Sequence, residues 1–154
     1  MPRLSGKNVY FDESSKANVN IKVQGYTLHA HKDILRQHVC FDNCLRSGTW
    51  SEACTGIIKL REHASYVVIL LEYIYHGHLN TSKIDCKIAK RLGRSHKHPR
   101  NDAFHAEHAE HAKILIDLWD LGDRYFMSGF CALCADHFTD LLVHTPGARY
   151  SWDV

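Results

Sequence analysis

Alternating hydrophobic and polar residues near the start of the chain predict a β-hairpin. Val19, Ile21 and Val23 alternate with polar residues, which is the two-residue period of a strand with one buried face. Gln24-Gly25 interrupts the alternation, and glycine supplies the positive φ that tight hairpin turns need. The alternation resumes over residues 26–30. Because an isolated hairpin is only marginally stable, other elements must cover its apolar face.

The pattern then changes to short helices and one further strand. Ile34-Leu35 lie on the apolar side of a predicted short helix. A second helix is predicted over residues 40–47, with Gly48 able to end it. Residues 49–55 are predicted as a loop, and residues 56–60 as a short buried strand.

Residues 64–75 form the most apolar of the predicted helices. A stripe at i, i+3, i+4 and i+7 spacing runs along it, formed by Val67, Leu70, Leu71 and Ile74. Further apolar residues widen this stripe nearly all round, and such a helix belongs in the centre of a domain. We therefore expect this helix and the hairpin to share one interior.

The C-terminal half of the chain is predicted to be mostly helical. A helix begins at Thr81-Ser82 and carries Ile84, Ile88 and Leu92 on one side; a basic linker follows over residues 93–101. A long helix over residues 102–125 has an apolar face formed by Ile114, Leu115, Leu118, Leu121 and Tyr125. The last helix is predicted over residues 128–142. Its inward-facing residues are Phe130, Leu133, Cys134, Phe138 and Leu141. A small sheet followed by helices indicates an α+β fold, with the sheet beside a cluster of helices.

The composition indicates a soluble protein with a single domain. The chain has 154 residues, enough to bury a core, and 45% of them are hydrophobic. No apolar run reaches the roughly 18 residues of a membrane-spanning helix, and the N-terminus lacks the apolar centre of a signal peptide. We therefore expect no membrane association and a location in the cytoplasm, the nucleus or both. The net charge of only +2 gives no global electrostatic reason to expect nucleic acid as a partner.

The six cysteines are predicted to be mainly buried thiols rather than disulfides or metal ligands. Most of them lie inside apolar helical patterns, and no secretion signal precedes them. Cys131-x-x-Cys134 has the spacing of a redox or zinc motif, but it lies mid-helix and has no second cysteine pair nearby. Two core cysteines on one helix explain this spacing better than a ligand pair does.

The order of these pieces resembles the BTB/POZ domain over about residues 17–142. The matching stretches are the strand pattern Val19-x-Ile21-x-Val23 with Gly25, the stretch LHAHKDIL at residues 28–35, GTWSE at 48–52, IIKL at 57–60, LLEYIYHG at 70–77 and Asp123-Arg124-Tyr125. The chain is similar in particular to short fungal BTB proteins, in which little else accompanies the domain. On this basis residues 1–16 are a weakly ordered N-terminal segment, about 84–111 are a His-rich basic insertion, and 143–154 are a tail.

The resemblance implies a protein-interaction module that forms homodimers. Members of this family usually carry an Asp just before the first strand, and in several members it pairs with a basic residue in a charged pocket at the dimer centre. In this chain Asn18 replaces the acid, whereas Lys32 keeps the base. Asn18 and Lys32 are therefore the candidate dimer-pocket residues.

Many BTB domains act as substrate adaptors of cullin-RING ubiquitin ligases, and others regulate transcription by recruiting corepressors. The cullin-contact signature of the family is an apolar residue, any residue and then Glu, after the third helix. Trp50-Ser51-Glu52 fits this signature, and an exposed Trp beside a carboxylate is a plausible interface anchor. The alternative is that Trp50 folds back onto the core and Glu52 is merely solvated.

Metal binding is the alternative function of a different class. The chain has thirteen histidines, and His105, His108 and His111 recur at every third residue of the predicted long helix. Three-residue steps advance about 300° around a helix, which offsets the first and last imidazoles by about 120°. One tetrahedral centre fits this offset poorly. We therefore treat these histidines as weak metal candidates and expect a solvated helical face without a cofactor.

Nucleic-acid binding and catalysis have less support. The basic stretch from Lys87 to Arg100 lacks interleaved aromatic residues, so a solvated face explains it better. The chain has no nucleophile elbow, no Gly-rich phosphate loop and no evident acid pair, so we expect no enzymatic activity. His29-Ala30-His31 belongs to the BTB pattern, and we expect it to close the hairpin and cap the next helix.

Overall fold

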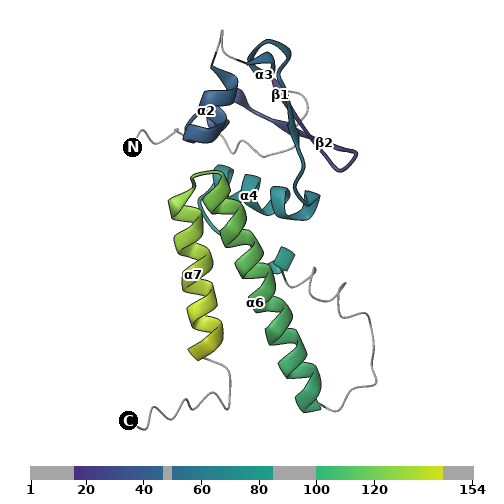
Figure 1. The fold of residues 1–154 in the computed structure, drawn as a ribbon, viewed down its shortest axis with the longest axis vertical. Coiled ribbons are helices and arrows are strands. Elements are labelled where there is room, and N and C mark those ends of the chain that lie inside the picture. The colour runs from purple at the N-terminus through teal and green to yellow at the C-terminus, as the bar shows by residue number, and fades with distance from the viewer. Residues whose placement is uncertain (1–15, 47–49, 85–99, 144–154) are drawn as a thin grey trace. The chain divides into compact units, whose positions relative to one another are not determined.

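The computed structural model describes residues 16–46, 50–84 and 100–143, with only the backbone described over 100–106 (Figure 1). The chain forms two compact units, residues 1–78 and residues 79–154. Each unit is described here by itself. The prediction of one domain over 17–142 stays a prediction.

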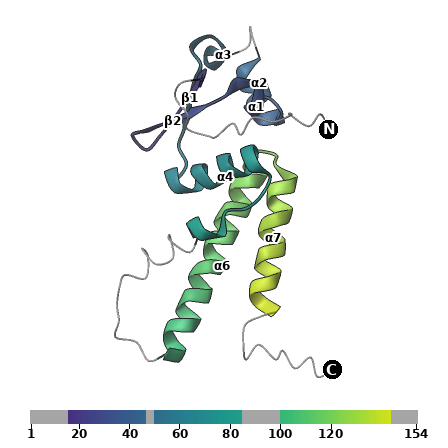
Figure 2. The same ribbon diagram turned by 180° about the vertical axis from the view of Figure 1, so that it is seen from behind.

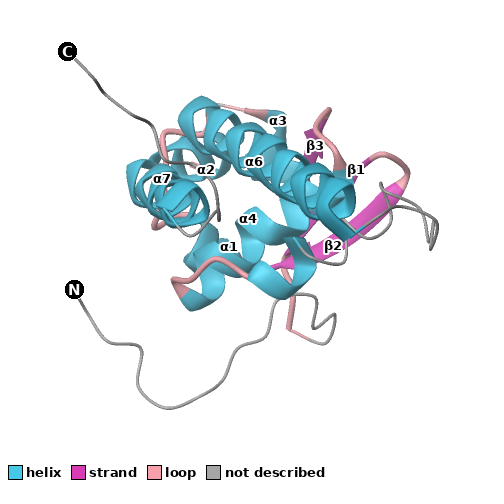
Figure 3. Cartoon of the chain, turned by 90° about the horizontal axis from the view of Figure 1, so that it is seen from below, coloured by secondary structure: helices cyan, strands magenta, loops and turns pink. Residues whose placement is uncertain are grey.

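The first unit is built on a three-stranded sheet, drawn in magenta in Figure 3. Strand β1 (Val19–Val23) lies between β2 (Tyr26–Ala30), its antiparallel hairpin partner, and β3 (Ile57–Leu60), which runs parallel to it. The hairpin turn places Gln24 at φ 47° and Gly25 at φ 82°, as a two-residue primed turn requires. The predicted hairpin and third strand are confirmed, and the inward residues of β1 are almost fully buried.

The described residues of this unit also form four helices: α1 (Lys32–Leu35), α2 (Val39–Leu45), α3 (Ser51–Thr55) and α4 (Ala64–His76). The prediction of a loop over residues 49–55 is wrong for 51–55, because α3 occupies them. This helix is only five residues long and has no buried residue, so it leaves no apolar period in the sequence. The predicted stop at Gly48 lies outside the described residues.

Helix α4 is hydrogen-bonded to the hairpin at both of its ends. At its start, the Ala64 backbone N–H donates to the side-chain oxygen of Gln24 over 2.9 Å. At its end, the Tyr75 hydroxyl contacts both the backbone nitrogen and Nδ1 of His31, at 2.8 and 2.9 Å. Its fully buried side chains are Val67, Ile69, Leu70 and Leu71, whereas Ile74 of the predicted stripe is only half-buried. Helix α4 and the hairpin thus belong to the same unit and are joined by hydrogen bonds, while their predicted common interior stays a prediction.

The second unit is a hairpin of two long helices, α6 (Arg100–Arg124) and α7 (Ser128–Val143), which lie side by side (Figures 1 and 2). Residues 81–84 before them are helical, and the Ile84 side chain is fully buried. Gly122 lets the two long helices approach closely, because a Cβ there would lie 2.7 Å from Cδ1 of Phe130. Four residues of the predicted α6 face are buried: Ile114, Leu115, Leu118 and Leu121.

The boundaries and faces of these helices differ in detail from the predictions. Helix α6 begins at Arg100, two residues inside the predicted basic linker, and the rest of that linker lies outside the described residues. On α7 the buried residues are Phe130, Cys131 and Cys134, while Leu133, Phe138 and Leu141 are half-buried. The predicted α+β class, with a small mixed sheet and several helices, is confirmed. Within the described ranges, no helix is long and apolar enough to cross a membrane.

Candidate interaction surfaces

Helix α3 carries the three residues predicted as a protein-contact site. The Trp50 side chain is 59% exposed and occupies the N-cap position of the helix, with an extended backbone. Ser51 Oγ donates a hydrogen bond to Glu52 Oε2 over 3.1 Å, which holds the carboxylate beside the helix start. The alternative, in which Trp50 folds back onto the core, is wrong. The site therefore presents a large indole and a carboxylate on one short helix.

Gly56 fixes α3 to the sheet. It adopts the left-handed conformation at φ 65°, and its N–H donates to the Glu52 carbonyl over 2.8 Å, which ends the helix. Its own carbonyl accepts from the Asn20 N–H of β1 over 2.7 Å. A Cβ at this position would lie 3.0 Å from the Asn18 carbonyl oxygen. Gly56 is thus the residue through which the sheet positions the Trp50–Glu52 surface.

Charged groups on α2 lie close to this helix. Asp42 accepts hydrogen bonds from Arg46 and Arg36, and these lower the pKa of its carboxyl group. The pKa of the Cys44 thiol is raised by burial and, secondly, by the Glu52 carboxylate. Glu52 therefore lies near enough to α2 to act on one of its thiols.

The structure brings Asn18 and Lys32 together, but through the backbone rather than as a charged pocket. The Lys32 backbone N–H donates to Oδ1 of Asn18 over 2.7 Å. Lys32 is the first residue of α1, so Asn18 supplies the acceptor that the start of this helix needs. His31 holds the N-cap position, but its side chain makes no capping bond. The prediction that this histidine caps the helix is wrong; its ring bonds Tyr75 instead.

Two further predictions concern histidines. The ring of His29 bonds Oδ1 of Asn20 across the hairpin over 2.9 Å, in keeping with a role in closing it. His105, His108 and His111 all lie on α6; the side chain of His105 is not described, and the other two are half-buried. Within the described part of the chain, no group of three metal-ligating side chains is placed to hold an ion. The basic residues 87–97 lie outside it.

The five described cysteines are free thiols. Cys131 and Cys134 are buried on α7, as predicted for core residues, and burial raises the pKa of Cys134 to about 12. Cys40 and Cys44 are half-buried, and Cys54 at the end of α3 is exposed. The prediction of mainly buried thiols is therefore right for α7 and wrong for Cys54.

The α6–α7 hairpin has an exposed apolar face that was not predicted from the sequence. Ile116 and Trp119 are 55% and 44% exposed, and both lie off the predicted apolar face of α6. Phe126, between the two helices, is 79% exposed and has φ 55°, a conformation that bulky residues rarely adopt. The sequence signal was available, because two large apolar residues stood outside the helical stripe. The left-handed backbone of Phe126 had no such signal.

Comparisons with known proteins give one type of match. No protein-family model matches the chain, and no curated protein matches it. Among solved structures, the chain is similar to the BTB (Tramtrack and Bric a brac) domain of human gigaxonin, with 13% sequence identity and a TM-score of 0.49. The match covers 80% of this chain and 79% of that chain. The predicted grouping with short fungal BTB proteins stays a prediction.

Proposed function

We propose that this chain is a protein-interaction module of the BTB/POZ type, acting in the cytoplasm or nucleus and catalysing no reaction of its own. The observation that carries the proposal is the exposed indole of Trp50 at the start of α3. A soluble protein gains nothing for its own stability by exposing the largest apolar side chain. Such a side chain beside a carboxylate is typical of an interface hot spot.

We further propose that the partner of this surface is a cullin scaffold, with the chain as a substrate adaptor. The sequence resemblance supports this choice, because Trp50-Ser51-Glu52 fits the residue pattern of the cullin-contact signature of the BTB family, at the start of α3 rather than in a loop after a third helix. The geometry is compatible with it, since the indole is exposed and Ser51 holds the Glu52 carboxylate close by. Gly56 joins this helix to the sheet, so the surface is preorganised and loses little entropy on binding.

Calorimetric titration with the N-terminal domain of a cullin tests the adaptor role. Trp50→Ala should weaken binding by about 2 kcal/mol or more, and Glu52→Gln by a smaller amount. The matched control is Tyr26→Ala, because Tyr26 is 64% exposed in the same unit but lies on the hairpin. Equal binding by wild type and Trp50→Ala would refute the cullin proposal. Loss of binding in both Trp50→Ala and the control Tyr26→Ala would indicate a general effect on folding.

Homodimerisation belongs to the same proposal and has its own test. The uncharged Asn18 satisfies the start of α1 and leaves Lys32 without the family's acidic partner at that position. Asn18→Asp restores the family's acid at this position. If a charged pocket promotes association in this chain, light scattering should give a larger dimer fraction for Asn18→Asp than for wild type at equal concentration. An identical fraction would show that these two residues do not govern association.

A further inference from the structure

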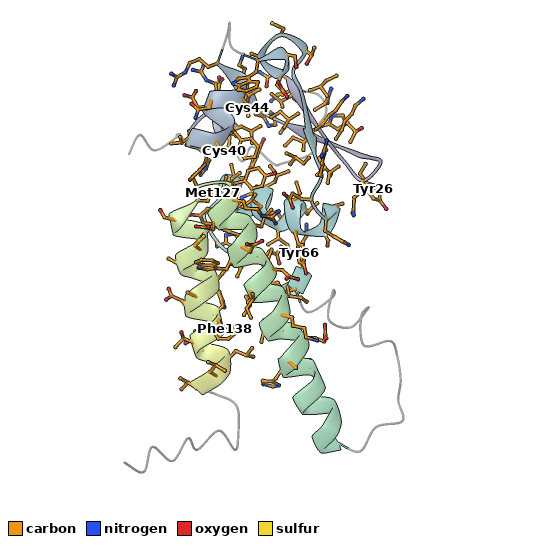
Figure 4. All side chains as sticks on the ribbon, viewed as in Figure 1. Tyr26, Cys40, Cys44, Tyr66, Met127 and Phe138 are labelled. Atoms are coloured by element: carbon orange, nitrogen blue, oxygen red, sulfur yellow. The ribbon has the colours of Figure 1, made fainter. Side chains whose placement is uncertain are left out.

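The apolar face of the α6–α7 hairpin contains two hollows that share Trp119. The first, of about 240 Å³, lies between Ile116 and Trp119 on α6 and Ala135 and Phe138 on α7. The second, of about 340 Å³, lies between Trp119, Asp123, Phe126 and Cys131. Figure 4 labels Phe138 on α7, which lines the first hollow, and Met127 just before α7, which lines the second. An apolar hollow of about 150 Å³ already accepts a benzene-sized group, so each can take one large side chain.

The spacing of the hollows matches the repeat of an α-helix. Phe138 in the wall of the first hollow and Cys131 in the wall of the second are seven residues apart on α7. At 1.5 Å per residue this separation is roughly 10 Å, or two helical turns. A helix docked along the hairpin would place side chains i and i+7 at this spacing, which is the usual mode of helix-in-groove recognition.

The negative charge of the α6–α7 hairpin favours a cationic partner helix. Residues 107–143 contain seven carboxylate side chains but only two Lys or Arg side chains. Asp123 lies in the wall of the second hollow, and none of the described cations is ion-paired to it. The pKa of the Cys131 thiol beside it is raised, first by burial and then by this carboxylate. Asp120, which follows Ile116 by one turn, is exposed and bonds Arg124 over 3.2 Å. A cationic partner complements this surface, whereas a second copy would bring like charge to it.

Phe126 is the left-handed residue that ends α6, where the Met127 N–H donates to the Gly122 carbonyl over 2.9 Å, and its exposed side chain is available to a partner. A left-handed backbone is unfavourable for a bulky side chain, and an exposed Phe gains no burial in return. Glycine would relieve this strain at no loss of core packing. Strained residues of this kind cluster at binding and switch sites. Phe126 therefore extends the apolar face at the end of the second hollow.

We propose that this face, defined by Ile116, Trp119, Asp123, Phe126 and Phe138, binds a cationic amphipathic helix of a partner protein. Two large apolar side chains of that helix, at i and i+7, fill the two hollows. Its Lys or Arg side chains pair with the carboxylates of α6. This surface belongs to the second unit and is separate from the Trp50–Glu52 surface, so either can fail without the other.

A designed peptide of leucine and lysine, about 18 residues or five turns long, serves as the probe. Its leucines follow i, i+3, i+4 and i+7 spacing, and the control peptide has glutamate in place of every lysine. Fluorescence anisotropy with the full chain should give binding of the lysine peptide and not of the glutamate peptide. Trp119→Ala should weaken binding at least about tenfold, while Tyr26→Ala, at an exposed aromatic residue of the first unit, should not change it.

Two further variants separate binding from structure. Asp123→Lys should weaken the lysine peptide and reduce its preference over the glutamate peptide, which a merely structural role for Asp123 would not produce. Phe126→Gly should raise the unfolding temperature and at the same time weaken peptide binding. Equal affinity for both peptides, or an unchanged affinity in Trp119→Ala, would overturn the proposal. So would light scattering that shows a dimer which Trp119→Ala converts to a monomer, because a second copy would then be the occupant.

Discussion

The Tyr75 hydroxyl lies 2.8 Å from the backbone nitrogen of His31 and 2.9 Å from Nδ1 of the same residue. The oxygen accepts from the His31 backbone N–H, and the same hydroxyl group is hydrogen-bonded to the ring nitrogen. The Tyr75 side chain therefore satisfies two polar groups of His31, the backbone N–H and the ring nitrogen Nδ1, between the end of β2 and the start of α1. It also ties the last turn of α4 to the hairpin.

Tyr75→Phe should destabilise the protein by about 1–3 kcal/mol, because it leaves the partly buried His31 N–H without its acceptor. Urea unfolding followed by circular dichroism measures this loss. Tyr26→Phe is the matched control, since the Tyr26 side chain is exposed on the hairpin. Equal stability of Tyr75→Phe and wild type would mean that the hydrogen bonds between the Tyr75 hydroxyl and His31 do not stabilise the protein.

Alkaline pH should weaken the same region. Burial raises the pKa of Tyr75 from its usual value near 10 to about 12. The folded state then holds this proton more tightly than the unfolded state. The stabilisation is complete below about pH 10 and is lost as the pH rises toward 12. After allowance for partial exposure, the loss should be about 1 kcal/mol.

Urea unfolding at a series of pH values tests this dependence. Cys134 titrates in the same direction, because burial raises its pKa to about 12 as well. The comparison is therefore made between Tyr75→Phe and wild type, both of which keep this thiol. The stability of wild type should fall more steeply between about pH 10 and 12. Parallel curves would rule out a contribution from Tyr75.

Asn18→Ala should cost about 1 kcal/mol, because the N–H of Lys32 at the start of α1 loses its acceptor. Asn18→Asp should keep or increase stability, since a carboxylate also accepts this bond and favours a helix N-terminus. Thermal unfolding of the two variants gives the comparison. If both variants lose the same stability, the capping role assigned to Asn18 is incorrect.

Gly56→Ala should destabilise the protein more than Gly25→Ala does. Both glycines have positive φ, so both substitutions carry a backbone cost of about 1–2 kcal/mol. Only at Gly56 does the new Cβ meet another atom, the Asn18 carbonyl oxygen at 3.0 Å; nothing lies within 4 Å at Gly25. The difference between the two free energies of unfolding isolates the contact between α3 and β1. A difference of zero would mean that β1 moves away freely.

Sequence patterns predicted the elements whose stability comes from long apolar faces. The hairpin, α4, α6 and α7 each repeat buried residues at a regular period, so their type and approximate bounds could be read from the chain. Helix α3 could not, because five residues without a buried side chain depend on bonds to β1 through Gly56. A local pattern contains no information on such distant partners.

The candidate site was predictable to a similar degree. Trp50 and Glu52 were found through their spacing, and their exposure agrees with a contact role. The capping role of Asn18 was not predicted from the sequence. Its side-chain acceptor and the Lys32 donor are fourteen residues apart, and the hairpin brings them together. The exposed Trp119 was not predicted, because it lies outside the buried stripe from which α6 was predicted.

Hydrogen exchange of the full chain, with and without a cullin N-terminal domain, tests the central claim most directly. If the Trp50–Glu52 surface is the docking site, amides of residues 50–55 should exchange more slowly in the presence of the cullin domain. The hairpin tip around Gly25 should be unaffected and serves as the internal reference. Unchanged exchange over residues 50–55 at saturating cullin domain would contradict the account.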